Sequence, residues 1–305
     1  MESSNTLGEE CGIFSIVAHP EASKLAYLGL YALQHRGQES AGIVSSDRRK
    51  LFIEKGMGYV ADLFNESRLA NLPGDSALGH VRYSTSGESA EWNAQPILIN
   101  CWRGPMALAH NGNLTNAAQL KRELEREGAI FHTTSDSEVV LHLISRSRRR
   151  TLQEAFVEAL RLIQGAYCMA LLTPQYLLVA RDTHGFRPLV LGLIRQSYVI
   201  SSETCALDLI NAEYVREITP GEVLMIEENS MESQFPLPKE QPSFCVFEHI
   251  YFSRPDSLVF GRTVSTSRRE MGRSLAREHS AAADVVVPVP DSGLSAAIGY
   301  AQESG

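Results

Sequence analysis

A single thiol lies near the start of the chain, where Cys11 follows an acidic leader, residues 1–10, and precedes a glycine and an apolar run. If the leader is removed, the Cys11 α-amino group has a reference pKa of about 7.7–8.0. That amine can take the thiol proton and return it to a leaving group, so one residue supplies nucleophile and base. The plainer alternative is a buried core cysteine. The leader and the glycine favour the nucleophile.

Four polar clusters follow in the first half of the chain, at residues 33–42, 79–87, 110–114 and 134–138. Each has an ordinary structural explanation when taken alone. An Asn-Gly pair is a common hairpin turn, a Ser-Asp pair often begins a helix, and histidines occur in cores. The histidines do not have metal-ligand spacing, so the sequence does not predict a zinc site.

Taken together, the clusters resemble the class II glutamine amidotransferases, and within that class the amidophosphoribosyltransferase family. The resemblance runs from about residue 9 to the end of the chain, and its motifs are Glu10-Cys11-Gly12-Ile13-Phe14, residues 34–42, Gly56-Met57-Gly58, residues 79–85, Asn93-Ala94-Gln95-Pro96, residues 110–116, 135–138 and 201–204, Pro220-Gly221-Glu222 and residues 251–257. It implies an α+β fold. A four-layer αββα N-terminal-nucleophile hydrolase domain is followed by the incomplete start of an α/β phosphoribosyltransferase domain.

The resemblance implies three catalytic groups. Cys11 is similar to the nucleophile that attacks the side-chain amide of glutamine and forms a glutamyl thioester. The side chain of Asn111 and the backbone N–H of Gly112 resemble the oxyanion hole of the family. A preorganised donor of this kind lowers the barrier by roughly 3–4 kcal/mol.

Five residues resemble the family's glutamine-binding residues. Arg82 is similar to the group that binds the substrate α-carboxylate, for which a guanidinium fork is well suited. Asp136 resembles the partner of the α-ammonium group, and Thr85 adds a hydrogen bond from the same loop as Arg82. Arg36 and Gly37 resemble a loop that folds over bound glutamine.

Cys245 is the one metal-ligand candidate. In the iron–sulfur branch of the family a cysteine at this place holds a four-iron cluster, with its other ligands far downstream. The residues alone favour a buried structural thiol. The resemblance also implies magnesium for the transferase half of the intact family, and it requires no cofactor for the glutaminase step.

Short apolar runs bounded by Gly, Asn and Pro predict the strands that carry these residues. The predicted strands are residues 13–18, 43–45, 51–54, 77–81, 106–109, 167–173, 176–181, 198–202 and 222–226. Strands, then helices, then strands again indicate sheets covered by helices.

Helical spacing and capping residues predict four helices in this region. The first covers residues 25–33, and the second begins after Asn116 and ends at Gly128. A capping box of Ser135 with Glu138 predicts a helix over 136–147, and a second box at residues 151 and 154 begins the next helix.

Three segments are predicted along the chain: a propeptide at 1–10, the glutaminase domain at 11–235, and a linker with a partial phosphoribosyltransferase domain at 236–305. The polar stretch 228–243, with three prolines, is the linker candidate. Beyond it, a helix over 267–279, a strand over 284–289 and a final helix resemble the opening of a doubly wound domain. Such a domain needs roughly 100–150 residues, so the chain is expected to be cut short.

Composition excludes several classes of protein. The net charge of −8 argues against binding to nucleic-acid phosphates, and no apolar run approaches the ~20 residues of a membrane span. Five widely spaced cysteines fit free thiols in a reducing cytoplasm, where the protein is expected.

The implied function is glutamine-dependent amidophosphoribosyltransferase, which makes 5-phosphoribosylamine, glutamate and pyrophosphate from glutamine and phosphoribosyl pyrophosphate in the first committed step of purine biosynthesis. The chain would carry the glutaminase half, and the full-length protein is expected to be a homo-oligomer. Two alternatives stay open: a stand-alone glutaminase, and a regulatory homologue that binds glutamine without turnover.

Overall fold

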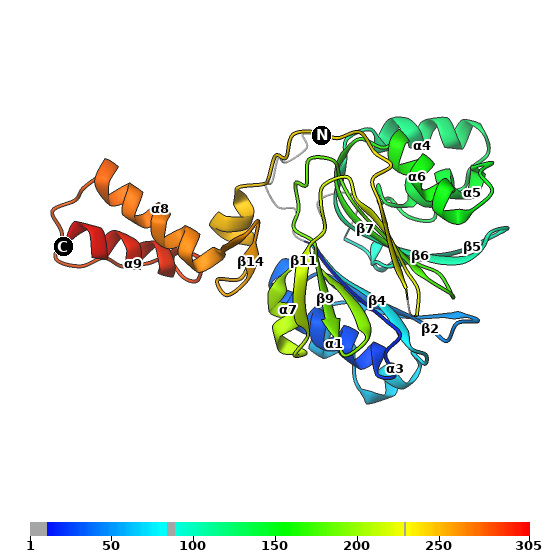
Figure 1. Cartoon of the computed structure of the whole chain (residues 1–305), viewed down its shortest axis with the longest axis horizontal. Helices are drawn as coiled ribbons and strands as arrows, with labels where there is room; N and C mark the ends of the chain where they lie inside the picture. Colours follow the sequence, from blue (N-terminus) through cyan, green and yellow to red (C-terminus); the bar gives the residue numbers. More distant parts are fainter. Residues whose placement is uncertain (1–10, 84–88, 229) are drawn as a thin grey trace.

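The computed structural model describes residues 11–83, 89–228 and 230–305 (Figure 1). The predicted propeptide and the predicted substrate contact Thr85 lie outside these ranges. Two parts are distinguished below: the sandwich, residues 11–234, and the arm, residues 235–305. Figure 1 shows the arm extending away from the layered sandwich, with the C-terminus at its far end.

The first sheet of the sandwich contains the N-terminal strand near its middle. Its strands are β1 (Cys11–Val17), β2 (Ser40–Ser46), β3 (Leu51–Met57), β4 (Ser76–Arg82), β9 (Val190–Ile194), β10 (Ser197–Ser201) and β11 (Glu213–Glu217). They run antiparallel in the order β11-β9-β10-β1-β4-β2-β3. Strand β1 is therefore paired on both sides.

The second sheet lies face to face with the first. Its strands are β5 (Ile97–Cys101), β6 (Gly104–Leu114), β7 (Gly165–Leu172), β8 (Leu177–Arg181), β12 (Val223–Ile226) and β13 (Met231–Gln234). They are ordered β13-β12-β8-β7-β6-β5 and are also antiparallel. Strand β13 occupies part of the stretch 228–243 that was predicted as linker. That prediction was wrong for residues 231–234, which pair with β12 at the sheet edge.

Helices cover the outer face of each sheet (Figure 1). On the first sheet lie α1 (Ala22–Ala32) and α7 (Thr204–Leu209), with the short helices α2 (Val60–Leu63) and α3 (Glu66–Ala70). On the second lie α4 (Ala117–Arg126), α5 (Glu138–Arg146) and α6 (Leu152–Leu162). Two 3-10 turns, η1 (Gln34–Arg36) and η2 (Glu91–Asn93), connect elements. The four layers confirm the predicted αββα architecture.

The alternation of side chains along β1 shows why this order of layers is stable. Ile13 and Val17 are buried in the core between the two sheets. Phe14 and Ile16 point the other way and pack in the core beneath α1. Successive side chains of a strand point to opposite faces, so a strand buried on both faces is apolar almost throughout.

The two predicted capping boxes have different outcomes. The box of Thr151 with Glu154 is confirmed and begins α6. The box of Ser135 with Glu138 is wrong, because α5 begins at Glu138 itself. The Glu138 carboxylate instead accepts hydrogen bonds from the backbone N–H groups of His132 and Thr133, at 2.9 and 2.7 Å. It thereby fixes the turn that leads into α5.

The arm begins with a polar segment and a π-helical turn, η3 (Glu248–Phe252), followed by a small hairpin, β14 (Leu258–Val259) and β15 (Arg262–Thr263). Two helices then lie side by side, α8 (Val264–Glu278) and α9 (Gly293–Ser304). The strand predicted at 284–289 is wrong: these residues are irregular and Val287 is 80% exposed. The residues of the arm that the structure describes offer this segment no neighbouring strand to pair with.

Candidate active site

The Cys11 thiol lies at the start of β1, on the face of the first sheet that looks toward the second. Cys11 has the parity of Ile13, which packs between the sheets. Its Sγ lies 3.8 Å from the backbone oxygen of Tyr83. Burial raises the pKa of the thiol to about 11, although the guanidinium groups of Arg82 and Arg36 oppose that rise. The thiol is therefore protonated at neutral pH and needs a base before it can attack.

Arg82 is directly opposite Cys11 in the antiparallel register of β1 and β4. Residues paired in this way carry their side chains on the same face, about 5 Å apart at Cβ. Arg82 is buried, so it places a positive charge between the sheets beside the thiol. This is where an anionic group of a substrate would be attracted.

Asn111, on β6, faces Cys11 from the opposite sheet. It has the parity of Ala107 and Ala109, which pack between the sheets, and β1 and β6 are in contact across this space. The side chain is fully buried, and within the described residues neither its oxygen nor its nitrogen has a hydrogen-bond partner. Buried amides are nearly always bonded, so an orphaned one points to a group that arrives from outside.

Gly112 must be a glycine at this position. Its φ is +145°, and a Cβ would lie 2.1 Å from the backbone oxygen of Ala166 on β7. In a strand, the N–H and C=O groups of every second residue point to the same edge. The N–H of Leu114, two residues on, points away from β7 to the Asp136 carboxylate. The Gly112 N–H therefore points to this same edge of β6.

The Asp136 carboxylate lies in the turn before α5, at that edge of β6. Its Oδ2 accepts the hydrogen bond from the Leu114 N–H at 2.9 Å. Its Oδ1 lies 3.8 Å from Nδ1 of His110 and accepts a 3.3 Å hydrogen bond from the Ser137 hydroxyl. The carboxylate is mostly buried and fixed in orientation, as a partner for a substrate ammonium group must be.

Arg36 is fully buried below Cys11, at the boundary between the sandwich and the arm. Its Nε donates to the backbone oxygen of Cys11 at 2.9 Å. The rest of the guanidinium pairs with Glu203 at 2.6 Å and Glu248 at 2.8 Å. The arginine lowers the pKa of both carboxyl groups, so both stay charged. The side chain predicted to fold over glutamine is thus directed at these carboxylates and at the nucleophile's main chain.

Gly37 follows Arg36 and lies against β4. A Cβ at this position would lie 2.5 Å from the backbone nitrogen of Arg82. The close approach requires a glycine and brings the 34–37 turn against the strand that carries Arg82. Of the predicted site residues, Cys11 and Arg82 lie opposite each other on β1 and β4, Asn111 and Gly112 lie on β6, which contacts β1, and Asp136 is bonded to Leu114 at the edge of β6.

Sequence reasoning missed the roles of Glu203 and Glu248. Glu203 belongs to a motif quoted above, but its carboxylate accepts hydrogen bonds from residues far away in the chain, including Arg36, His35 and Ser257. The available signal was the acidic residue itself at each of these two buried positions. The neighbouring sequence does not show that Arg36 is the partner of both.

Cys245 lies where the arm begins, outside the cluster just described. Its backbone N–H donates to Phe186 at 3.2 Å, and its Sγ is 3.8 Å from a guanidinium nitrogen of Arg187. Among residues 11–83, 89–228 and 230–305, no three His, Cys, Asp or Glu side chains are grouped to hold a metal.

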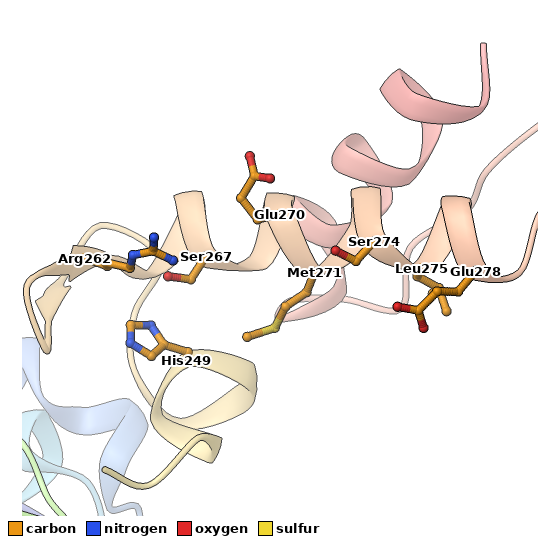
Figure 2. Close-up of a pocket in the computed structure, with 8 residues that line it drawn as sticks. All are labelled: His249, Arg262, Ser267, Glu270, Met271, Ser274, Leu275 and Glu278. Atoms are coloured by element: carbon orange, nitrogen blue, oxygen red, sulfur yellow. The ribbon is translucent and has the colours of Figure 1, made fainter. Parts of the chain in front are cut away.

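One hollow lies on the arm and another lies where the arm meets the sandwich. One of about 470 Å³ lies along α8, between His249 and Glu278 (Figure 2). Its side chains come from α8, η3 and β15, and none belongs to the predicted site. A second, of about 360 Å³, lies between His35 and residues 251–255 and 290–292. In the described ranges, no helix has the length and apolar character needed to cross a membrane.

Comparison with known proteins agrees with this geometry. The glutamine amidotransferase domain family matches residues 80–209. The amidophosphoribosyltransferase of Rhizobium etli is 49% identical over 99% of the chain and 62% of its own length. Among solved structures, the "allosteric regulatory enzyme of purine biosynthesis" superposes with a TM-score of 0.94 at 47% identity, covering 96% of this chain and 63% of that one.

A second solved structure is the glutamine phosphoribosylpyrophosphate amidotransferase of Bacillus subtilis complexed with ADP and GMP. It superposes with a TM-score of 0.93 at 46% identity, over 96% of this chain and 64% of that one. The chain thus spans about three fifths of the length of these proteins. Sequence identity near one half over almost the whole chain confirms the predicted resemblance to the amidophosphoribosyltransferase family.

Proposed function

We propose that the chain hydrolyses glutamine at Cys11 once residues 1–10 have been removed. The observation that carries this proposal is the buried, unpartnered amide of Asn111, on the strand that faces the Cys11 thiol. If Asn111 had only a structural role, burying its amide without a hydrogen-bond partner would be unfavourable. An oxyanion formed beside Cys11 would supply that partner.

The first chemical step is attack of the thiol on the side-chain amide carbon of glutamine. With a pKa near 11 the Cys11 thiol is protonated, and the freed α-amine of the same residue takes its proton. The S–C bond forms, and the carbonyl electrons move to oxygen. The Asn111 amide and the Gly112 N–H donate to that oxyanion.

Collapse of the tetrahedral intermediate breaks the C–N bond. The α-ammonium returns its proton to the leaving nitrogen, so ammonia departs and a glutamyl thioester remains on Cys11. Water then attacks the thioester, with the same amine as base, and releases glutamate and the thiol. Throughout, Arg82 binds the α-carboxylate and Asp136 the α-ammonium of the substrate. Thr85 adds a hydrogen bond, and the loop at Arg36 and Gly37 covers the bound glutamine.

For the intact protein we propose amidophosphoribosyltransferase activity, in which the released ammonia displaces pyrophosphate from phosphoribosyl pyrophosphate. The resemblance to the amidophosphoribosyltransferase family supports this proposal. Magnesium would accompany the pyrophosphate substrate in the transferase half, and a homo-oligomer is the expected assembly. The five cysteines are all free thiols, as in a reducing cytoplasm.

The test measures glutamine hydrolysis and the N-terminal mass of the purified chain. We expect loss of residues 1–10 and ammonia release by the processed protein. Cys11→Ala should abolish the release. Cys101→Ala is the matched control, because that thiol also lies 3.8 Å from a backbone oxygen, in the β5–β6 hairpin.

The outcomes separate the alternatives. Full activity in Cys11→Ala would remove the assigned nucleophile. Glutamine binding without hydrolysis in the processed wild type would favour the regulatory homologue. The third outcome concerns the intact protein assayed with glutamine and phosphoribosyl pyrophosphate. Hydrolysis of glutamine without formation of phosphoribosylamine would favour a stand-alone glutaminase.

A further inference from the structure

The oxyanion strand β6 loses its neighbour just before it reaches the site. Strand β5 begins at Ile97, which pairs with Leu108 on β6. Two residues further along, the N–H and C=O of His110 point to the same edge, where β5 is no longer present. A buried backbone group left unpaired at this point would be destabilising, because it has lost its hydrogen bonds to water.

Two side chains take the place of the missing strand at His110. The Gln95 Oε1 accepts the hydrogen bond from the His110 N–H at 2.7 Å. The His80 Nε2 lies 2.9 Å from the His110 carbonyl oxygen. Because a carbonyl only accepts, Nε2 must carry the proton. Gln95 and His80 thus hold the two backbone groups of the residue that precedes Asn111.

His80 reaches this peptide from the other sheet. It lies on β4 with the parity of Leu78, which packs between the sheets, and it is fully buried. Burial lowers its pKa to about 3, so the ring is neutral and keeps one N–H. The groups facing the ring are the His110 carbonyl, which favours the charged form, and Arg82 and His110, which oppose it.

Gln95 has a second contact, on the side of the ammonium-binding residue. Its Nε2 donates to the Ser137 hydroxyl at 3.3 Å, and that hydroxyl also lies 3.0 Å from Nδ1 of His110. Ser137 directly follows Asp136 and donates to its carboxylate. One buried amide therefore connects the oxyanion strand with the turn that carries Asp136.

We propose that His80 and Gln95 are positioning residues for glutamine hydrolysis, acting through the backbone C=O and N–H of His110, the residue that precedes Asn111. The proposal rests on the glutaminase function proposed above. His80 fixes the carbonyl that leads directly into Asn111, so its role concerns the transition state. Gln95 fixes the same strand and, through Ser137, the residue that binds the ground-state substrate.

These two roles predict different kinetics. His80→Ala should lower kcat about 10–100-fold and leave KM for glutamine within about twofold, because a displaced oxyanion donor affects only the transition state. Gln95→Ala should lower kcat and also raise KM several-fold. A residue needed only for stability would not separate kcat from KM in this way.

The experiment compares the processed wild type with four variants, in steady-state glutamine hydrolysis and in urea unfolding. His80→Gln retains a donor near the place of Nε2 and should recover most of kcat, with the pH profile of the wild type because His80 stays neutral. Gln95→Ala and His80→Ala are the test variants. His19→Ala is the matched control, since His19 is a buried histidine bonded to backbone, just beyond the other end of β1.

His19→Ala should keep wild-type kcat and KM. If His80→Ala and Gln95→Ala do so as well, or if His80→Gln is as impaired as His80→Ala, the proposal is overturned while glutaminase function stands. If His80→Ala does not fold, His80→Gln and Gln95→Ala still decide the question through their kcat and KM. Absence of hydrolysis in the processed wild type would instead overturn the proposed function and this inference with it.

Discussion

The sandwich and the arm differ in what holds them together. In the sandwich, apolar side chains are buried in three cores, one between the sheets and one beneath each layer of helices. In the arm, α8 and α9 meet mainly through small residues. A Cβ at Gly272 would lie 1.9 Å from the backbone oxygen of Ala296. The comparison teaches that the sandwich is stabilised from within, whereas the arm has close helix contact but little buried apolar area.

The contact between the two parts is polar. Arg36 of the sandwich pairs with Glu248 of the arm, and Glu203 of the sandwich accepts from Arg254 N–H and the Ser257 hydroxyl. Both carboxylates are fully buried. Buried ion pairs contribute little net stability but are costly to break, because the remaining charge is left without a partner. The junction is therefore specific in geometry and sensitive to single substitutions.

The largest difference between the sandwich and the arm should be in how much a truncated apolar side chain lowers the free energy of unfolding. Phe156→Ala in α6 should lower the free energy of unfolding by about 3–5 kcal/mol, because it leaves a cavity beside the second sheet. Leu275→Ala in α8, at a half-exposed position, should cost less than about 1 kcal/mol. Tryptophan fluorescence in urea is the measurement, since both tryptophans, Trp92 and Trp102, lie in the sandwich. Equal losses would show that the sandwich and the arm unfold as one core.

Removing the buried cation at the junction should have the next largest effect. Arg36→Met removes the cation that Glu203 and Glu248 share and should cost about 3 kcal/mol. Limited proteolysis should then cleave residues 235–247 faster and leave the sandwich intact. Arg254→Met is the control, because its pair with Asp256 is largely exposed and contributes less than about 1 kcal/mol. Unchanged proteolysis in Arg36→Met would mean that other contacts hold the arm.

Acid should weaken the sandwich through Glu138. Although burial opposes the shift, His142 at 3.6 Å and hydrogen bonds from His132 and Thr133 lower the pKa of this carboxyl to about 2 in the folded chain, against its usual value near 4.5. The stabilisation is therefore complete above about pH 4.5 and is lost as the pH falls toward 2. Glu138→Gln should cost roughly 1–3 kcal/mol at pH 7 and flatten the stability profile between pH 4.5 and 2. An unchanged profile would show that other carboxylates govern acid unfolding.

The smallest effect is expected at the exposed valines of the arm. Val287→Ser should change the free energy of unfolding by no more than about 0.5 kcal/mol, because the side chain is 80% exposed. Val179→Ser, between the two sheets, is the contrast and should cost roughly 1–3 kcal/mol for burying a hydroxyl. A comparable loss in Val287→Ser would show that residues 284–289 are covered in solution.

Structure that depends on interactions between residues close in sequence could be predicted. The Thr151–Glu154 capping box acts over one helical turn, and α6 begins where it predicted. The strand at 284–289 was predicted from the same local information and was wrong, because a strand needs a partner that apolar residues alone do not supply. The predicted capping box of Ser135 with Glu138 was also wrong, because Glu138 bonds to the residues before it and α5 begins at Glu138.

The residues of the candidate site could be recognised from their types and motifs. The residues that hold them in place could not. Cys11, Asn111 and Asp136 lie in recognisable motifs. Their support comes from contacts that join distant positions, such as Arg36 with Glu248, which are 212 residues apart. Gln95 illustrates the same difficulty, because its importance depends on where β5 begins relative to β6.

The central place of β1 has a consequence for the order in which the protein is made. Strand β1 is synthesised before both of its neighbours, because it pairs with β4 (Ser76–Arg82) and with β10 (Ser197–Ser201). Its second neighbour is synthesised almost 200 residues later, so the strand that carries the thiol must wait while most of the sandwich emerges. At roughly 5–20 residues per second, this delay lasts on the order of ten seconds or more. The strand that carries Cys11 therefore acquires its final surroundings late in synthesis, after the layers that enclose it exist.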